Sequence, residues 1–217
     1  MQTLTEGIIE AGWSERVISE GQLRRLVSGS DQRRYHLVNR AAAAGELVRL
    51  RRGRYVLGHA LRRRAAHPFV LAQGFEAGSY VSFETALAHH GWIPEAVRSV
   101  ASVTSGSKSA AYQPAGFGSY SFHPLAIEPS GFLLLVERVE LSGQYALVAR
   151  PLRALMDLVC LRKQAWQGIA WLIEGLRIDV DALRSVTGDE LRALGQVYRQ
   201  RRVQAFLKAL SRALGDD

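Results

Sequence analysis

A closely spaced series of helix caps and turns limits the possible folds of this 217-residue chain more than any other feature. Ser19 and Gln22 have the spacing of a capping box, which marks the start of a helix. Residues 28–30 (SGS) form a short connection that contains glycine, as in a helix-turn-helix. Ser30 then caps a second predicted helix, and Gly45 ends it in the left-handed conformation. The spacing therefore predicts two short helices joined by a tight turn.

A predicted β-hairpin follows directly over residues 47–57. Two short apolar strands flank a turn at Arg52-Gly53, so the tip of the hairpin is basic. A further helix is predicted upstream over residues 3–11. Because this order of helices and hairpin is typical of a winged helix-turn-helix, we predict that domain for residues 1–58.

The charge of the chain is concentrated near its N-terminus. Residues 1–64 contain 13 Arg, no Lys and 6 acidic residues, whereas residues 65–217 contain 15 basic and 14 acidic residues. A GC-rich genome would explain why Arg outnumbers Lys, but not why the excess of basic over acidic residues lies at one end. A basic module joined to a nearly neutral one indicates a phosphate-contacting domain followed by a domain with another role. We place a basic linker at residues 59–66 and a second domain at residues 67–217.

The predicted helix over residues 31–44 is amphipathic. Arginine can pair with guanine, and asparagine or glutamine with adenine, in the major groove that such a helix enters. Arginines near the hairpin tip suit phosphates or a minor groove, and arginines on the preceding helix suit the DNA backbone. We therefore predict that double-stranded DNA is contacted by Gln32, Arg33, His36, Asn39 and Arg40, by Arg51, Arg52 and Arg54, and by Arg24 and Arg25.

The other side of this helix is predicted to face the core through Tyr35, Val38 and Ala42. Tyr35 and Tyr55 are interpreted as core residues rather than as side chains that stack on bases. Arg34 lies off the polar face, so we expect it to pack or pair locally.

The second domain is predicted to be α+β, with a small mixed sheet followed by a helical end. Strands are expected over 97–103, 119–125 and 132–148, the last as a hairpin turned at Ser142-Gly143. The intervening residues 104–118 are rich in Ser, Gly and Ala and are predicted to be an exposed loop. Helices are predicted over 68–76, over 82–90 with Ser82 as the cap, from Pro151 to about Cys160, over 166–177, from Thr187 and over 203–214.

No catalytic, metal or cofactor site is predicted. Residues 105–108 match the S-x-x-K spacing of acyl-transfer enzymes but lack the partner motifs. His89 and His90 are adjacent on a predicted helix, so their side chains point about 100° apart and cannot share a metal. Asp179 and Asp181 are interpreted as helix-capping residues. No lysine has an acidic residue two positions before it, which argues against the common nuclease motif.

The chain contains no run of 18 apolar residues, and its N-terminus has no signal-peptide pattern. Its single cysteine, Cys160, cannot form an internal disulfide and is interpreted as a core residue. These features predict a cytoplasmic protein that has no membrane partner.

Four segments carry a resemblance to a known family: residues 50–57 (LRRGRYVL), 80–91 (YVSFETALAHHG), the strand into 103–104, and 149–158 (ARPLRALMDL). In their order and spacing the chain resembles AbiEi-type antitoxins, the antitoxin and transcriptional repressor components of type IV toxin–antitoxin systems in phage defence. The resemblance implies an autorepressor that binds repeats in its own promoter. It also implies a second domain with antitoxin activity against a nucleotidyltransferase-like toxin.

Two other functions remain open at this point. The chain could be a stand-alone winged-helix regulator whose second domain senses a small molecule or another protein. Trp92, Trp166 and Trp171 could line such a pocket, although tryptophans at these positions are more often core residues. An enzyme delivered to DNA is disfavoured by the missing motifs, and the sequence predicts no oligomeric state.

Overall fold

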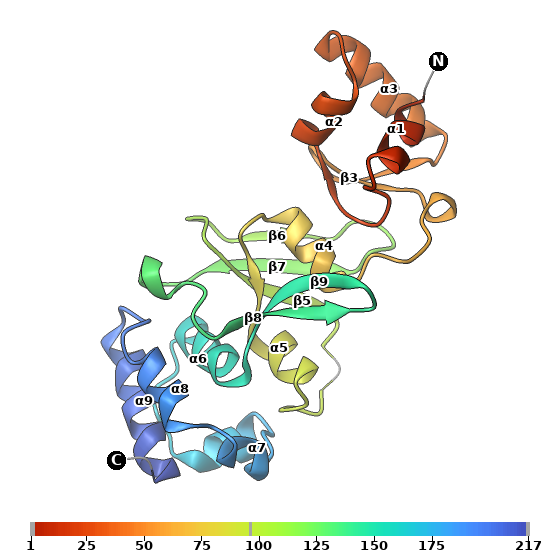
Figure 1. Ribbon diagram of the computed structural model, residues 1–217. Helices are drawn as coiled ribbons and strands as arrows, with labels where there is room; N and C mark the ends of the chain where they lie inside the picture. The colour runs from red at the N-terminus through yellow and green to blue at the C-terminus, as the bar shows by residue number, and fades with distance from the viewer. Residues whose placement is uncertain (1–2, 96, 216–217) are drawn as a thin grey trace.

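A computed structural model of the chain describes residues 3–95 and 97–215. The chain forms an N-terminal unit at one end, a central sheet with its helices, and a helical end that contains the C-terminal residues (Figure 1). The predicted α+β class, with a mixed sheet and a helical end, is confirmed. Within the described residues, no helix is long and apolar enough to cross a bilayer.

The N-terminal unit contains three helices and a three-stranded antiparallel sheet in the order β1-β3-β2. A small core that includes Ile8, Leu23 and Leu57 holds helices and sheet together. The elements are α1 (Leu4–Glu10), β1 (Ile18–Ser19), α2 (Glu20–Leu26), α3 (Asp31–Ala43), β2 (Leu47–Arg51) and β3 (Arg54–Leu57).

The predicted caps of this unit are confirmed. Ser19 and Gln22 form a reciprocal capping box at the start of α2. The Ser30 hydroxyl accepts from the Arg33 amide at the start of α3, and Gly45 has a φ of +70° just after its end. Because each of these interactions spans only a few residues, local sequence suffices to specify it.

The central sheet has six strands in the order β6-β7-β5-β4-β9-β8. The β5–β7 and β4–β9 pairs are parallel and the other three pairs are antiparallel, so the sheet is mixed as predicted. The strands are β4 (Tyr80–Val81), β5 (Ser99–Thr104), β6 (Ala110–Tyr112), β7 (Ser119–Pro124), β8 (Val136–Leu141) and β9 (Gln144–Ala149).

Helix α4 lies on the side of the sheet that faces the N-terminal unit, whereas α5 and α6 lie on the other side (Figure 1). Helix α6 also contacts α8 and α9, which joins the helical end to the sheet. The helices are α4 (Pro68–Phe75), α5 (Phe83–His89), α6 (Pro151–Arg162), α7 (Val180–Arg184), α8 (Gly188–Leu194) and α9 (Arg201–Leu214), with short 3-10 turns at His59–Leu61 and Pro129–Gly131.

Three predictions for the second unit were wrong. The segment predicted as a loop over 104–118 contains β6, which pairs with β7. The helix predicted over 166–177 is shorter, because helical residues 169–170 continue only into one π-helical turn at Trp171–Gly175. The predicted hairpin starts only at Val136, because the preceding residues form a turn in which Leu135 has a φ of +55°. In the first case, pairing with β7 overrides a weak local preference.

Candidate nucleic-acid interface

Helix α3 turns a different side toward the core than its sequence predicts. Its buried residues are Arg34, Val38 and Ala41, whereas Tyr35 is 61% exposed and Ala42 is also exposed. The prediction that Tyr35 belongs to the core was therefore wrong, while the same prediction for Tyr55 is confirmed. The apolar stripe of α3 is short, so tertiary contacts decide which neighbouring residue completes it.

Arg34 occupies the inward position next to Tyr35 because it has acidic partners there. Its Nη2 donates to Asp31 one turn before it, and its Nε lies 3.7 Å from Glu20 at the start of α2. This confirms the expectation that Arg34 packs and pairs locally. The interaction also fixes the packing of α2 against α3, since each helix supplies one of the carboxylates.

A groove of about 710 Å³ separates α3 from the hairpin formed by β2 and β3. It brings together four of the predicted DNA-contacting residues, which come from three elements. Tyr55, Val38 and the buried Arg34 also line it, and the acidic groups are Glu20 and Asp31. The polar and aromatic side chains available to a ligand are Arg24, Gln32, Tyr35, Asn39, Arg49 and Arg52.

The other predicted residues of α3 and α2 lie beside this groove rather than in it. Arg33 and Arg40 are exposed but line separate hollows next to α1. His36 is exposed, and its Nε2 lies 2.9 Å from the Gln32 side-chain nitrogen. Arg25 is exposed on α2.

The three hairpin arginines have different surroundings. Arg52 is exposed at the tip. Arg51 donates from Nε to the Phe75 carbonyl at 3.1 Å, and its Nη2 lies 3.4 Å from Glu76. Arg54 donates from Nε to the Gly74 carbonyl at 3.0 Å. In this arrangement Arg51 and Arg54 join the hairpin to the C-terminal end of α4, and their predicted contact with DNA stays a prediction.

An irregularity in β2 separates Arg49 from Arg51. Strand alternation would place these two side chains on the same face of the hairpin. However, the pairing register shifts between Arg49, which is opposite Tyr55, and Arg51, which is opposite Arg54. A shift of this kind re-aims a side chain, so Arg49 lines the groove while Arg51 contacts α4.

Sequence reasoning missed two residues of this groove, Tyr35 and Arg49. Arg49 could have been found, because it is a basic residue on a strand next to a basic tip. Tyr35 could not, because a tyrosine at the edge of an amphipathic helix is compatible with either side.

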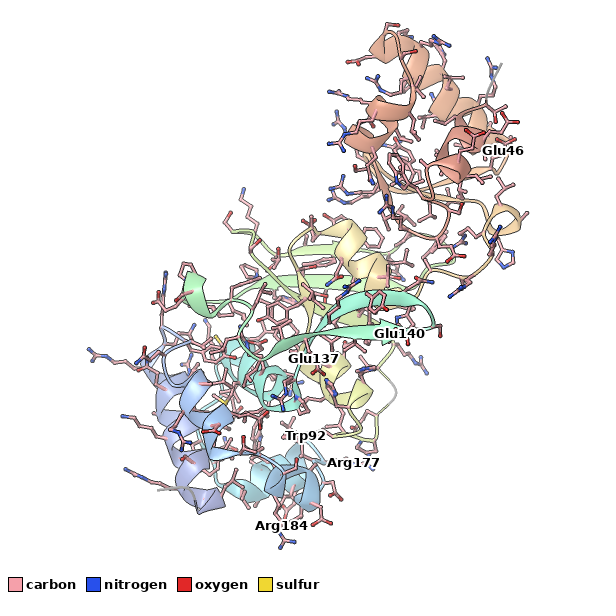
Figure 2. The ribbon with its side chains drawn as sticks, in the orientation of Figure 1. Glu46, Trp92, Glu137, Glu140, Arg177 and Arg184 are labelled. Atoms are coloured by element: carbon pink, nitrogen blue, oxygen red, sulfur yellow. The ribbon has the colours of Figure 1, made fainter. Side chains whose placement is uncertain are left out.

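The positive side chains gather on one side of the N-terminal unit. Figure 2 shows blue nitrogen atoms along the side that carries α2, whereas Glu46 lies toward α1. Glu46 is held there by a hydrogen bond from the Thr5 hydroxyl at 2.5 Å. The unit therefore has a basic side and a side on which an acidic residue is fixed.

Residues 80–91 and 149–158, the two longer segments that carry the family resemblance, meet in a buried polar cluster of the second unit. Arg153 and Asp157 of α6 are both fully buried and are joined by a 3.0 Å ion pair. Asp157 also accepts hydrogen bonds from Tyr80, Ser82 and Tyr198. Because Ser82 donates to Asp157, it does not cap α5 with its side chain, contrary to the prediction.

The remaining donors of Arg153 are also satisfied. Its Nη1 donates to the carbonyls of Gly131 and Leu134, and its Nη2 donates to the Tyr80 hydroxyl. Burial, and then the charge of Asp157, raise the pKa of Tyr80 and Tyr198 well above the usual value, so both hydroxyls keep their protons. A buried cluster with this many internal bonds serves to hold the fold together.

The other candidate chemical groups are dispersed. Ser105 and Lys108 are exposed in the segment before β6. His90 is half-buried with its Nε2 3.0 Å from the Ala149 carbonyl, whereas His89 is exposed. Cys160 is buried, as predicted, and burial raises its pKa to about 11. Over residues 3–95 and 97–215, no three His, Cys, Asp or Glu side chains are placed to hold a metal ion.

The sequence was also compared with known proteins. No protein-family model matches the chain, and a search of curated proteins finds no similar sequence.

Proposed function

We propose that the N-terminal unit is a winged helix-turn-helix that binds duplex DNA. The observation that carries the proposal is the groove between α3 and the hairpin, where amide and guanidinium side chains from α2, α3, β2 and the tip converge. A B-form major groove is about 12 Å wide and admits one α-helix. With α3 in that groove, the hairpin tip would reach the neighbouring backbone or minor groove.

The order of elements supports this proposal. Helix α2 and helix α3 are joined by a short turn, and the β2–β3 hairpin follows α3 directly. Strand β1 completes the small sheet by pairing with β3. This arrangement agrees with a helix-turn-helix that carries one wing.

The proposed roles follow from the chemistry of each side chain. Gln32 and Asn39 can each form two hydrogen bonds with adenine, and Tyr35 can contact a thymine methyl or a phosphate. Arg24, Arg49 and Arg52 supply positive charge around them for phosphates. Arg25, Arg33, His36 and Arg40 extend this surface on α2 and α3.

Binding of the full-length protein to the DNA upstream of its own reading frame tests the proposal and its autorepressor component. Fluorescence anisotropy should show tighter binding to this duplex than to a shuffled duplex of equal length. The affinity for both should fall steeply with salt, because each phosphate contact releases counterions. Salt-independent binding would contradict the proposed groove, and equal affinity for both duplexes would contradict autorepression.

The second proposed role is that of an antitoxin, and it rests on the resemblance described above. The two longer segments that carry the resemblance lie together in the second unit, where Ser82 of one bonds to Asp157 of the other. Co-expression with a nucleotidyltransferase encoded beside this gene tests the role. Restored growth supports it, and growth arrest that the protein does not relieve contradicts it.

A further inference from the structure

A cavity of about 440 Å³ opens in the second unit, away from the proposed DNA-binding groove. It lies where α4 begins, α5 ends and the parallel strands β5 and β7 start, with Ser99 opposite Ser119. Its volume is within the range of about 300–1,000 Å³ that is common for small-molecule sites. None of the roles proposed above uses this cavity.

Part of the cavity wall is aromatic. Phe69 and Tyr120 are buried, and Phe117, two residues before β7, is half-buried. Phe69 packs edge-to-face against His67 and His89, with ring centroids 4.9 and 5.4 Å apart. Such walls favour a flat, unsaturated ligand, because aromatic rings pack well in stacked and edge-to-face arrangements.

Two side chains of the cavity, His67 and Arg98, can donate hydrogen bonds to a ligand. His67 Nδ1 accepts a hydrogen bond from the Phe69 amide at 3.2 Å, so the neutral ring carries its proton on Nε2. Burial, and then the neighbouring His89, lower the pKa of His67, which keeps that ring neutral near pH 7. His67 is therefore a hydrogen-bond donor with a fixed tautomer.

Arg98 adds a positive charge at the rim of the cavity. Its side chain is exposed at the rim, and no carboxylate in the described part of the chain lies within 4.0 Å of its guanidinium. The acidic residue that lines the cavity, Glu95, is paired instead with Arg177 at 3.1 Å. One free guanidinium suits a carboxylate, which accepts two parallel bonds from arginine and carries a single charge.

We propose that this cavity binds a small aromatic carboxylate. The ring of the ligand lies among Phe69, Phe117 and Tyr120, and its carboxylate accepts hydrogen bonds from Arg98 and from His67 Nε2. Helix α4 connects this site to the hairpin, since it begins beside His67 and its last turn accepts hydrogen bonds from Arg51 and Arg54. The proposal for the ligand site does not depend on DNA binding.

Isothermal titration of the full-length protein with benzoate and 4-hydroxybenzoate tests the proposal, with neutral benzamide as the comparison. We expect saturable binding of at least one carboxylate, with a dissociation constant of about 1 mM or lower. The same carboxylate should raise Tm increasingly with its concentration, because it binds the folded state. Benzamide should bind about tenfold more weakly, since it lacks the charge that Arg98 recognises.

Two variants and a control locate the site. Arg98→Gln should weaken carboxylate binding about tenfold without changing the Tm of the free protein, because the side chain is exposed. Phe117→Ala should weaken the binding of the carboxylate and of benzamide by a similar factor, because both ligands carry the ring that Phe117 contacts. Arg201→Gln removes an exposed arginine from the start of α9 and should leave binding unchanged. The proposal is overturned if neither carboxylate binds, if benzamide binds equally well, or if the Arg98→Gln protein binds like the unchanged protein.

Discussion

In the N-terminal unit Arg24, Arg49 and Arg52 carry exposed guanidinium groups around a groove, whereas in the second unit the guanidinium of Arg153 is fully buried. Arg153 has an ionic partner and four further hydrogen-bond acceptors. Arg24 is 3.9 Å from an exposed Asp31, which is a weak interaction. Arginine therefore stabilises the fold at position 153, whereas at positions 24, 49 and 52 its charge remains available for a partner.

The hairpin between the two units shares features of both. Leu47, Tyr55 and Leu57 pack into the small N-terminal core, whereas Leu50 and Val56 belong to the larger core of the second unit. Gly74 of α4 approaches the N-terminal unit so closely that an added Cβ would lie 2.1 Å from the Val17 side chain. The hairpin, which is the proposed wing, therefore also joins the two units. A DNA contact made by the hairpin would be transmitted to α4 and the central sheet through these packing contacts.

The largest effect should come from breaking the buried cluster. Asp157→Ala leaves Arg153 charged and unpaired in the core, which should lower the free energy of unfolding by about 3–5 kcal/mol. Urea denaturation of the two proteins measures the difference. Asp181→Ala removes a carboxylate from an exposed pair with Arg184 and should cost less than about 1 kcal/mol. Similar losses of stability in the two variants would show that burial does not make the Arg153–Asp157 pair more important for stability than the exposed Arg184–Asp181 pair.

The next effect concerns base recognition in the proposed groove. Asn39→Ala should remove about 1–3 kcal/mol of discrimination at one base pair, because an asparagine pairs with both polar groups of adenine. Anisotropy titrations against duplexes changed one position at a time measure this loss. Arg33→Ala is expected to act in the same way at a neighbouring position. If neither variant relaxes any position, α3 does not read bases.

Loss of the contact between Arg51 and α4 should lower the free energy of unfolding by a smaller amount. Arg51→Ala removes the bonds to Phe75 and Glu76 and should lower the free energy of unfolding by about 1 kcal/mol. Hydrogen exchange should then increase in the last turn of α4. Arg49→Ala changes the neighbouring groove-facing arginine on the same strand and should leave that exchange unchanged. Equal exchange in both variants would mean that Arg51 does not hold the units together.

Arg52→Ala should produce a still smaller and less specific effect. Because Arg52 is exposed at the tip, its loss should weaken all duplexes by a similar factor and reduce the slope of log affinity against log salt by about 1. Titrations at several salt concentrations measure the slope. A loss confined to one base sequence would assign Arg52 to base recognition instead.

The smallest expected effect is a dependence of stability on pH in the second unit. Burial lowers the pKa of His67, His90 and His123 from the ordinary value of 6.5. These histidines bind protons more readily in the unfolded chain than in the folded protein. The free energy of unfolding should therefore be highest above about pH 6.5 and should decrease as the pH falls through the pKa values of the folded protein. Urea titrations at several pH values should show this decrease, and His90→Gln should reduce it. A decrease of unchanged size in the His90→Gln protein would remove His90 from the cause.

The sequence alone determined the three helices and the hairpin of the N-terminal unit and most of their ends, but not the short strand β1. The capping box at Ser19, the cap at Ser30 and the left-handed Gly45 act within a few residues, so their spacing is readable in the chain. The charge difference between the two units is likewise a property of composition. The sequence also identified Gln32, Asn39, Arg24 and Arg52 as candidates, and the fold places these four around one groove.

Only the tertiary structure decided which neighbouring residue of α3 faces the core, Arg34 or Tyr35. It also decided that Arg51 and Arg54 contact α4, and that Ser82 bonds to Asp157 instead of capping a helix. The partners of Arg51, Arg54 and Ser82 lie 20 or more residues away in the sequence. The partner of Arg34 on α2 depends on how α2 packs against α3. Local spacing specifies backbone conformation, whereas the burial and pairing of a long polar side chain depend on which distant groups the fold brings beside it.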